Sequence, residues 1–210
     1  MKRGAVLMLL VLAILGLLAA ATVSVVHDGL SARAQPSTLE AAIAGMMRKL
    51  AMPASMSATK NPVQNSPEAL REGMLHFADH CAICHGNDGS GATAMGRGLY
   101  PKPPDLRAAA TQSRSDGEIF WIIENGVRLT GMPAFGGPAS GGEGLHADPR
   151  DSWNLLLFIR HLPALSAEEH IEMEKYNPKG PDERLEEQEE NDFLNGGPAK
   201  PSSEPQQHHH

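Results

Sequence analysis

The apolar residues of the chain form one long run near the start, followed by shorter segments with helical spacing. The long run covers residues 5–26, 22 positions without a charged side chain. Roughly 20 apolar residues suffice for a helix to cross the hydrocarbon core of a bilayer, so this run predicts a transmembrane helix. Lys2 and Arg3, in the short segment 1–4, are expected to stay in the cytoplasm and to direct the rest of the chain outward.

A cleavable secretory signal is the alternative for the same run. Ala32-Arg33-Ala34 offers an A-x-A cleavage site. The apolar region of a signal spans roughly 7–15 residues, however, whereas this run is longer and ends well before Ala34. We therefore favour an uncleaved anchor and leave the alternative open. Both interpretations place the body of the protein outside the cytoplasm.

Residues 27–65 are polar and are predicted to link the anchor to the next domain. Five apolar side chains recur at helical spacing within residues 38–50, which predicts a short amphipathic helix. They are Leu39, Ile43, Met46, Met47 and Leu50. Thr38 is suited to cap this helix and Pro53 to end it. The helix is expected either to pack on its own domain or to lie near the membrane surface. Three prolines among Ser and Asn in 53–67 are typical of a linker.

Four further helices are predicted from apolar periodicity and from capping residues. They span residues 66–80, 116–125, 151–162 and 166–176. Ser166 and Glu169 form the Ser-x-x-Glu pattern of a capping box. Loops are predicted where glycine or proline is frequent. These stretches are residues 86–98, 101–104 and 136–144. The core is therefore predicted to be all-α.

Composition and charge refine this picture. Aromatic residues make up only 4% of the chain, which suggests that a large buried cofactor supplies apolar surface to the core. Much of the net charge of −7 arises in residues 168–192, where 11 Asp and Glu face 3 Lys and Arg. Residues 166–210 are thus predicted to form an acidic helix and a partly disordered tail, with a candidate helix at 182–194. No basic patch with interleaved aromatics occurs, so nucleic acid is excluded as a partner.

The chain has only two cysteines, Cys81 and Cys84, and His85 follows the second directly. This count excludes a structural zinc site with four cysteines. A disulfide that closes so short a loop would add little stability. C-x-x-C-H is the pattern of c-type haem attachment. A redox-active C-x-x-C is the competing interpretation, but the outward-directed chain and the absence of a βαβ pattern favour haem.

In the haem interpretation both cysteines bind the porphyrin through thioether bonds, and His85 binds the iron as the proximal ligand. A sixth ligand is expected from the opposite wall of the pocket. Met132 is the leading candidate, because Gly131 lets the backbone approach the ring and Pro133 stiffens the loop. The other candidate methionines are Met95 and Met74. Ligation by histidine and methionine leaves no open position for a substrate, which favours electron transfer over catalysis.

Residues 66–165 resemble a single-haem class I cytochrome c domain of the membrane-anchored bacterial type. Four features carry this resemblance, in the right order along the chain. They are Gly73 and Phe77 before Cys81-Ala-Ile-Cys84-His85-Gly86, then Pro103-Pro104-Asp105-Leu106, then Gly131-Met132-Pro133-Ala134-Phe135, and last the helix at 153–162. The resemblance implies a cytochrome c-like helical bundle around one covalent haem. It also implies that Gly73 lets the first helix cross the last one closely, with Phe77 near Trp153 and Leu157.

The resemblance assigns expected roles to further residues around the haem. A proline carbonyl, that of Pro104 rather than Pro103, is expected to accept the Nδ1–H of His85 and so to orient the ring. Trp121 is a candidate for a hydrogen bond from its indole N–H to a haem propionate, with plain core packing as the alternative. His76 and His80 are four apart, a spacing that can bind metal, but no third ligand is evident nearby.

The expected function is that of an electron carrier rather than an enzyme. Its expected partners are redox proteins, such as a membrane dehydrogenase, a reductase or a terminal oxidase of a respiratory chain, together with the membrane itself. No small-molecule substrate is expected. The expected location is the bacterial inner membrane, crossed once, with the haem domain on the periplasmic side. The alternatives are a subunit of a larger respiratory oxidoreductase and a haem-based gas sensor with an open sixth site.

Overall fold

The computed structural model describes residues 2–28, 31–137 and 148–195, and every regular element in these ranges is helical. In chain order the elements are α1 (Lys2–Asp28), α2 (Thr38–Ala51), α3 (Ala54–Ala58), α4 (Pro67–His76), the π-helix η1 (Phe77–Cys81), α5 (Ala82–His85), α6 (Ala94–Arg97), α7 (Ala109–Gln112), α8 (Asp116–Asn125), α9 (Pro149–His161), the 3₁₀-helix η2 (Leu162–Ala164), α10 (Ala167–Glu174) and α11 (Pro181–Leu194). The all-α prediction is confirmed. Most of the predicted glycine-rich loop at 136–144 and the end of the tail lie outside the described residues.

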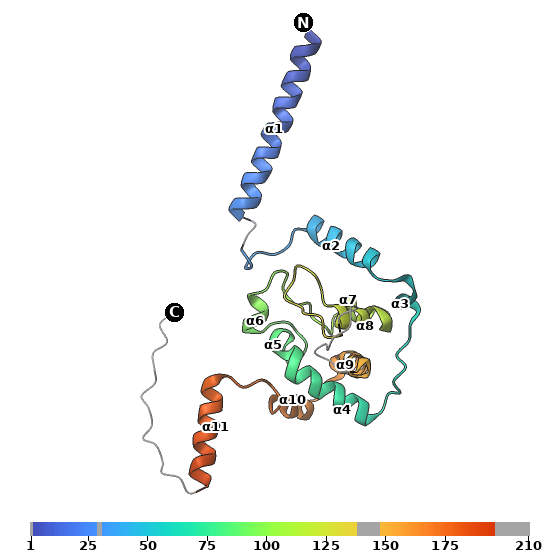
Figure 1. The fold of residues 1–210 in the computed structure, drawn as a ribbon, viewed down its shortest axis with the longest axis vertical. Coiled ribbons are helices and arrows are strands. Elements are labelled where there is room, and N and C mark those ends of the chain that lie inside the picture. The colour runs from blue at the N-terminus through green and yellow to red at the C-terminus, as the bar shows by residue number, and fades with distance from the viewer. Residues whose placement is uncertain (1, 29–30, 138–147, 196–210) are drawn as a thin grey trace.

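Helix α1 stands away from the other helices (Figure 1). Its segment Arg3–Ser24 has a mean hydropathy of 2.9, and it is long and apolar enough to cross a membrane. No part of this segment is buried in the protein. A signal sequence would pass the same test of length and composition, so the anchor and the cleaved signal both remain compatible with the helix.

Helices α4 and α9 cross in backbone contact, and Gly73 makes this crossing close. A Cβ atom at Gly73 would lie 2.6 Å from the carbonyl carbon of Asn154, so no side chain fits there. Figure 1 shows α4 and α9 side by side, with α8 beside α9. The close approach expected at Gly73 is therefore present.

Phe77 is fully buried and packs on Phe158, with ring centroids 5.2 Å apart. Phe158 lies four residues after Asn154 and so shares the face of α9 that meets α4. Trp153 stacks on Phe120 of α8 at 3.9 Å and belongs to the same hydrophobic core as Phe77. The expected packing of Phe77 on Leu157 stays a prediction.

Capping side chains set most helix ends close to the predicted positions. Ser115 with Glu118, and Ser166 with Glu169, form complete capping boxes at the starts of α8 and α10. One predicted cap and one predicted helix start are wrong by a residue or two. Ser37 rather than Thr38 caps α2, since the Ser37 hydroxyl accepts from the backbone N–H of Glu40. Helix α9 begins at Pro149, where proline suits the first turn, instead of at residue 151.

The segment predicted as a linker at 53–67 packs on the bundle. It contains α3, and the backbone N–H of Gly117 in α8 donates to the carbonyl of Thr59 at 3.2 Å. The Asn61 amide donates to the carbonyl of Trp153 in α9 at 3.0 Å. These polar residues therefore attach the chain to the bundle, which composition alone did not indicate.

Helix α10 is also part of the packed unit, so the boundary predicted at residue 165 falls inside it. Met173 has no exposed surface and belongs to the hydrophobic core. Just beyond the helix, the Asn177 amide donates to the carbonyl of Ala78 at 3.1 Å and to the Asn87 side chain at 3.0 Å. Only α11, which lies apart from the bundle in Figure 1, matches the expectation of a separate acidic helix.

Candidate haem-binding site

The attachment motif lies on a change of helix type. After α4 the chain forms one π-helical turn, in which the backbone N–H of Ala82 donates to the carbonyl of Phe77 five residues earlier. Cys81 ends this turn, and Cys84 and His85 follow in α5. No disulfide joins Cys81 and Cys84. Single π-helical turns often occur at functional sites, and sequence reasoning did not predict this one.

The environment of the two thiols is apolar. Burial raises the pKa of Cys81 to about 12, and the neighbouring Cys84 adds to the effect. Burial also raises the pKa of Cys84. Both side chains are therefore neutral thiols at pH 7, which suits bonding to an apolar porphyrin edge better than binding a metal ion as thiolates.

The His85 imidazole is held in the neutral form required of an iron ligand. Burial lowers its pKa, and the backbone of Pro104, acting as a hydrogen-bond acceptor, partly opposes that effect. The Nδ1 atom is shielded from solvent, and the ring approaches Pro104 outside ordinary hydrogen-bond geometry. Pro104 is the proline expected at this place. A neutral imidazole beside a backbone carbonyl is the usual arrangement of a histidine that ligates a metal.

The glycine-rich loop after the motif packs against the proline segment at residues 101–104. Gly86 has a φ of 75°, which turns the chain sharply out of α5. Gly91 then donates to the carbonyl of His85 at 2.7 Å, and a Cβ atom at Gly91 would lie 2.5 Å from the carbonyl oxygen of Pro103. Glycine is therefore required at position 91 for two reasons. A side chain would collide with the Pro103 carbonyl, and the φ of 75° favours glycine. The loop thus positions the proline segment beside His85.

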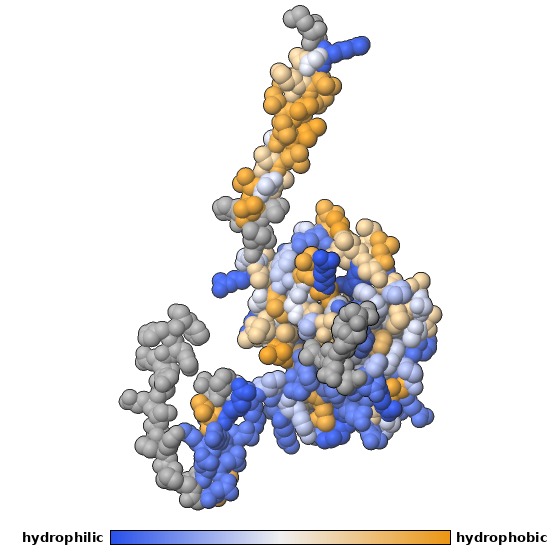
Figure 2. Space-filling view, viewed as in Figure 1, coloured by the Kyte–Doolittle hydropathy of each residue, from blue (hydrophilic) through white to orange (hydrophobic). Residues whose placement is uncertain are grey.

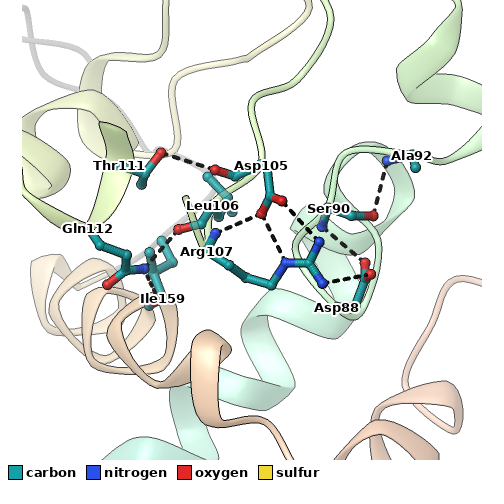
Figure 3. A network of polar contacts seen from close by, with 9 residues as sticks. All are labelled: Asp88, Ser90, Ala92, Asp105, Leu106, Arg107, Thr111, Gln112 and Ile159. Carbon is teal, nitrogen blue, oxygen red and sulfur yellow. Dashed lines mark hydrogen bonds and ion pairs between the residues drawn. The ribbon is translucent and has the colours of Figure 1, made fainter. Parts of the chain in front are cut away.

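An arginine bridge reinforces this contact (Figure 3). Arg107 donates to Asp105 at 2.9 Å and to Asp88, in the glycine-rich loop, at 3.3 Å. The Arg107 hydrogen bond is the main cause that lowers the pKa of Asp105. Arg107 thus joins the two loops, whereas Arg97 donates within its own loop to the carbonyl of Ala92 at 2.8 Å.

Gln112 at the end of α7 ties the proline segment to the last helix of the bundle. Its amide donates to the carbonyl of Leu106 and to that of Ile159 in α9, both at 2.8 Å (Figure 3). The backbone N–H of Leu106 in turn donates to the carbonyl of Gly89 at 2.8 Å. Sequence reasoning missed this network, because neither the spacing nor the type of these residues marks them out.

The far half of the glycine-rich loop folds back on the attachment helix. Thr93 caps α6 and donates its hydroxyl to the carbonyl of Ile83 at 2.9 Å. Gly96 packs so closely that a Cβ atom there would lie 2.6 Å from the carbonyl oxygen of Cys84. Met95, on the same short helix, is 52% exposed.

Met132 lies in a loop folded against the end of α8. Gly126, with φ of 63°, ends that helix, and a Cβ atom there would lie 2.7 Å from the carbonyl oxygen of Pro133. The Met132 carbonyl accepts from Val127 at 3.2 Å, and its N–H donates to the Thr130 hydroxyl at 3.1 Å. The Met132 side chain is half-buried, whereas that of Met74 belongs to the hydrophobic core.

The same loop reaches the chain near the attachment motif. A Cβ atom at Gly131 would lie 2.7 Å from the Leu99 side chain, two residues beyond α6. Gly131 and Leu99 thus bring the Met132 loop against the segment that packs on α5. The role of Met132 as an iron ligand stays a prediction.

Two other predicted features are Trp121 and the pair His76 and His80. Trp121 is half-buried in α8, and within the described chain its indole N–H makes no hydrogen bond, so its role also stays a prediction. His76 and His80 stack at 5.8 Å, and the described residues hold no group of three His, Cys, Asp or Glu that could bind a metal ion. The interpretation of this pair as packed histidines is preferred.

The donor set fits covalent haem: two neutral thiols three residues apart, a neutral shielded imidazole directly after them, and a proline carbonyl beside its ring. Together with the helical bundle, this site defines a class I c-type cytochrome domain. Residues 68–147 match the family model described as cytochrome C oxidase, cbb3-type, subunit III. This part of the chain is therefore similar to a c-type cytochrome domain, the kind of domain that carries covalently bound haem iron and acts in electron transfer. No curated protein matches the chain in sequence.

Proposed function

We propose that this chain is a membrane-anchored cytochrome with one haem c that carries single electrons on the periplasmic side of a bacterial inner membrane. The observation that carries the proposal is the environment of Cys81, Cys84 and His85, which suits one covalent haem. The sequence contains no other cysteine, so a second haem held by two thioether bonds has no attachment site. The long apolar helix α1 supports attachment to the membrane.

Each residue of the site would have a separate role in binding the haem. Cys81 and Cys84 would hold the porphyrin edge, and His85 and Met132 would ligate the iron from opposite faces. Pro104 would fix the orientation of the His85 ring and tune its basicity. Haem iron bound in this way supplies reversible one-electron oxidation and reduction. Because both axial positions would be filled by side chains, we propose no enzymatic turnover of a substrate.

The second candidate is a subunit of a larger respiratory oxidoreductase. The matched family model favours it, since its description names a subunit of a cytochrome oxidase. That match covers residues 68–147, less than half of the chain. A bound subunit and a tethered carrier would use the same haem site. The subunit would stay bound to one redox partner, whereas the carrier would bind and release its partners.

Purification of the full chain in mild detergent, from cells that attach haem c, tests both candidates. One haem per chain, a reversible one-electron titration and no bound partner are expected for the tethered carrier. Constant copurification with other respiratory subunits would replace it by the second candidate. Binding of carbon monoxide by the untreated reduced protein would instead indicate an open iron and a sensor, contrary to the proposal.

The intact mass of the purified holoprotein tests the anchor. An uncleaved anchor predicts a mass that includes residues 1–34 and resistance to extraction by alkaline carbonate. A mature chain that starts at residue 35, directly after Ala34, would show instead that the segment is a signal.

A further inference from the structure

Helix α2 turns its polar side toward the haem domain. Glu40 accepts a hydrogen bond from the Tyr100 hydroxyl at 2.7 Å. Arg48 is half-buried, and its pKa is lowered by this burial and by nearby Arg114, while Glu118 of α8 opposes the effect. Glu40 and Arg48 of α2 thus lie beside the bundle.

The side of α2 that faces away from Arg48 is an exposed apolar stripe, with Glu40 at its edge. None of its five large apolar side chains is buried, and their exposed fractions run from 45% to 78%. They are Leu39, Ile43, Met46, Met47 and Leu50. At 3.6 residues per turn they fall within an arc of about 100°. Figure 2 shows apolar side chains over α2, along the side of the domain from which α1 extends.

Contacts that follow α2 in the chain hold it in this orientation. Helix α3 comes three residues later, and its end is attached to α8 through the hydrogen bond from Gly117 to the Thr59 carbonyl. A helix on a soluble domain normally buries its apolar stripe. Helix α2 does the reverse, so its stripe needs an apolar environment outside the protein.

A lipid surface is the environment within reach. Nine residues separate Asp28 at the end of α1 from Thr38, and a stretch of that length spans at most about 35 Å. The stripe itself is one helix wide and about 20 Å long, roughly 200 Å² in area. A stable protein interface needs about 800 Å² per partner, so a second copy or another protein fits the stripe less well.

We propose that α2 lies in the interface of the bilayer that α1 crosses, with its apolar stripe among the lipid headgroups and upper acyl chains. This inference rests on the proposed anchoring by α1. Lys49, exposed in the last turn of α2, would suit an anionic surface. The haem domain would then be held against the membrane in one orientation, with Tyr100 on its membrane side, rather than tumbling on a tether.

Spin labels on the full-length holoprotein in nanodiscs of phosphatidylethanolamine and phosphatidylglycerol test this. The native cysteines are consumed by haem attachment, so Met46→Cys and Leu50→Cys each give one label on the stripe. Ser57→Cys, on exposed α3, is the control. Labels at positions 46 and 50 should collide several-fold more often with lipid-soluble oxygen than with an aqueous nickel chelate, and the control should show the reverse. Aqueous access at both stripe positions, or shielding from both reagents by a protein cover, would overturn the proposal.

A charge placed in the stripe provides a second test. Ile43→Asp should make the label at position 50 water-accessible, while Leu185→Asp, at an exposed apolar position on α11, should leave it in lipid. An unchanged label in Ile43→Asp counts against the proposal. Extraction with alkaline carbonate distinguishes a failure of the docking of α2 from a failure of the anchoring by α1. Retention in the membrane with water-accessible labels overturns the docking of α2 alone, whereas release from the membrane overturns the anchoring on which it rests.

Discussion

Gly73 of α4 lies directly against the backbone carbonyl of Asn154 in α9. The contact leaves no room for a methyl group, because the obstacle is backbone rather than the end of a flexible side chain. Gly73→Ala should therefore force the two helices apart and lower the free energy of unfolding by about 1–3 kcal/mol, the usual cost of overpacking. Urea unfolding of the holoprotein followed by circular dichroism measures this loss.

Gly45→Ala is the matched control for this prediction. Gly45 lies inside α2, and a Cβ atom there would meet nothing within 4 Å. Alanine should be neutral at this position or stabilise by up to about 1 kcal/mol through helix propensity. Equal effects of the two substitutions would show that the crossing of α4 and α9 tolerates a side chain at Gly73.

Gln112 should contribute to stability through the two carbonyls it satisfies. Gln112→Ala leaves the carbonyls of Leu106 and Ile159 without their donor and should cost about 1–3 kcal/mol. The adjacent exposed Ser113 makes Ser113→Ala a suitable comparison, expected to change stability by less than about 0.5 kcal/mol. Urea midpoints of the two holoproteins decide the matter, and coincident midpoints would mean that water replaces the Gln112 amide without loss.

Met132→Ala should open the sixth position of the iron. The absorption spectrum is expected to change from low-spin to high-spin, and the reduced protein should then bind carbon monoxide. The midpoint potential should fall by a measurable part of the roughly 0.8 V range over which axial ligands set haem potentials. Met95→Ala, which removes an exposed side chain on α6, should leave spectrum and potential unchanged. The reverse pattern would transfer the ligand role to Met95.

The sequence predicted the parts of this molecule that depend on local pattern. The apolar run of α1, the capping box at Ser166 and the attachment motif all follow from neighbouring residues. The need for glycine at position 73 was foreseen only through the resemblance to a family, because its reason is a contact with Asn154, far along the chain.

The parts that sequence did not predict depend on contacts between distant segments. The hydrogen bonds of Gln112 and the bridge from Arg107 to Asp88 involve common polar residues. Their partners are known only when the arrangement of the loops in the folded protein is known. The π-helical turn at Phe77 has no propensity signal of its own. The hydrogen bond from Asn61 to the Trp153 carbonyl was likewise not predicted, because the composition of residues 53–67 indicated a linker.

Glu169 should make stability depend on pH in the acid range. Burial alone would raise the pKa of its carboxyl, but hydrogen bonds from Ser166 and the contact with His161, at 2.9 Å, lower it below the ordinary value of 4.5. A lowered pKa means that the carboxylate stabilises the fold fully above the ordinary value, and that this stabilisation disappears as pH falls through the folded pKa.

Glu169→Ala should thus cost about 1 kcal/mol at pH 7, through the lost cap of α10. The gap to the native chain should close as pH falls below 4.5. Glu168→Ala, in the same first turn but more exposed, is the control, and urea midpoints from pH 7 down to pH 3 measure both variants. A gap between Glu169→Ala and the native chain that stays constant over this range would show that packing, and not the charge, carries the contribution of Glu169.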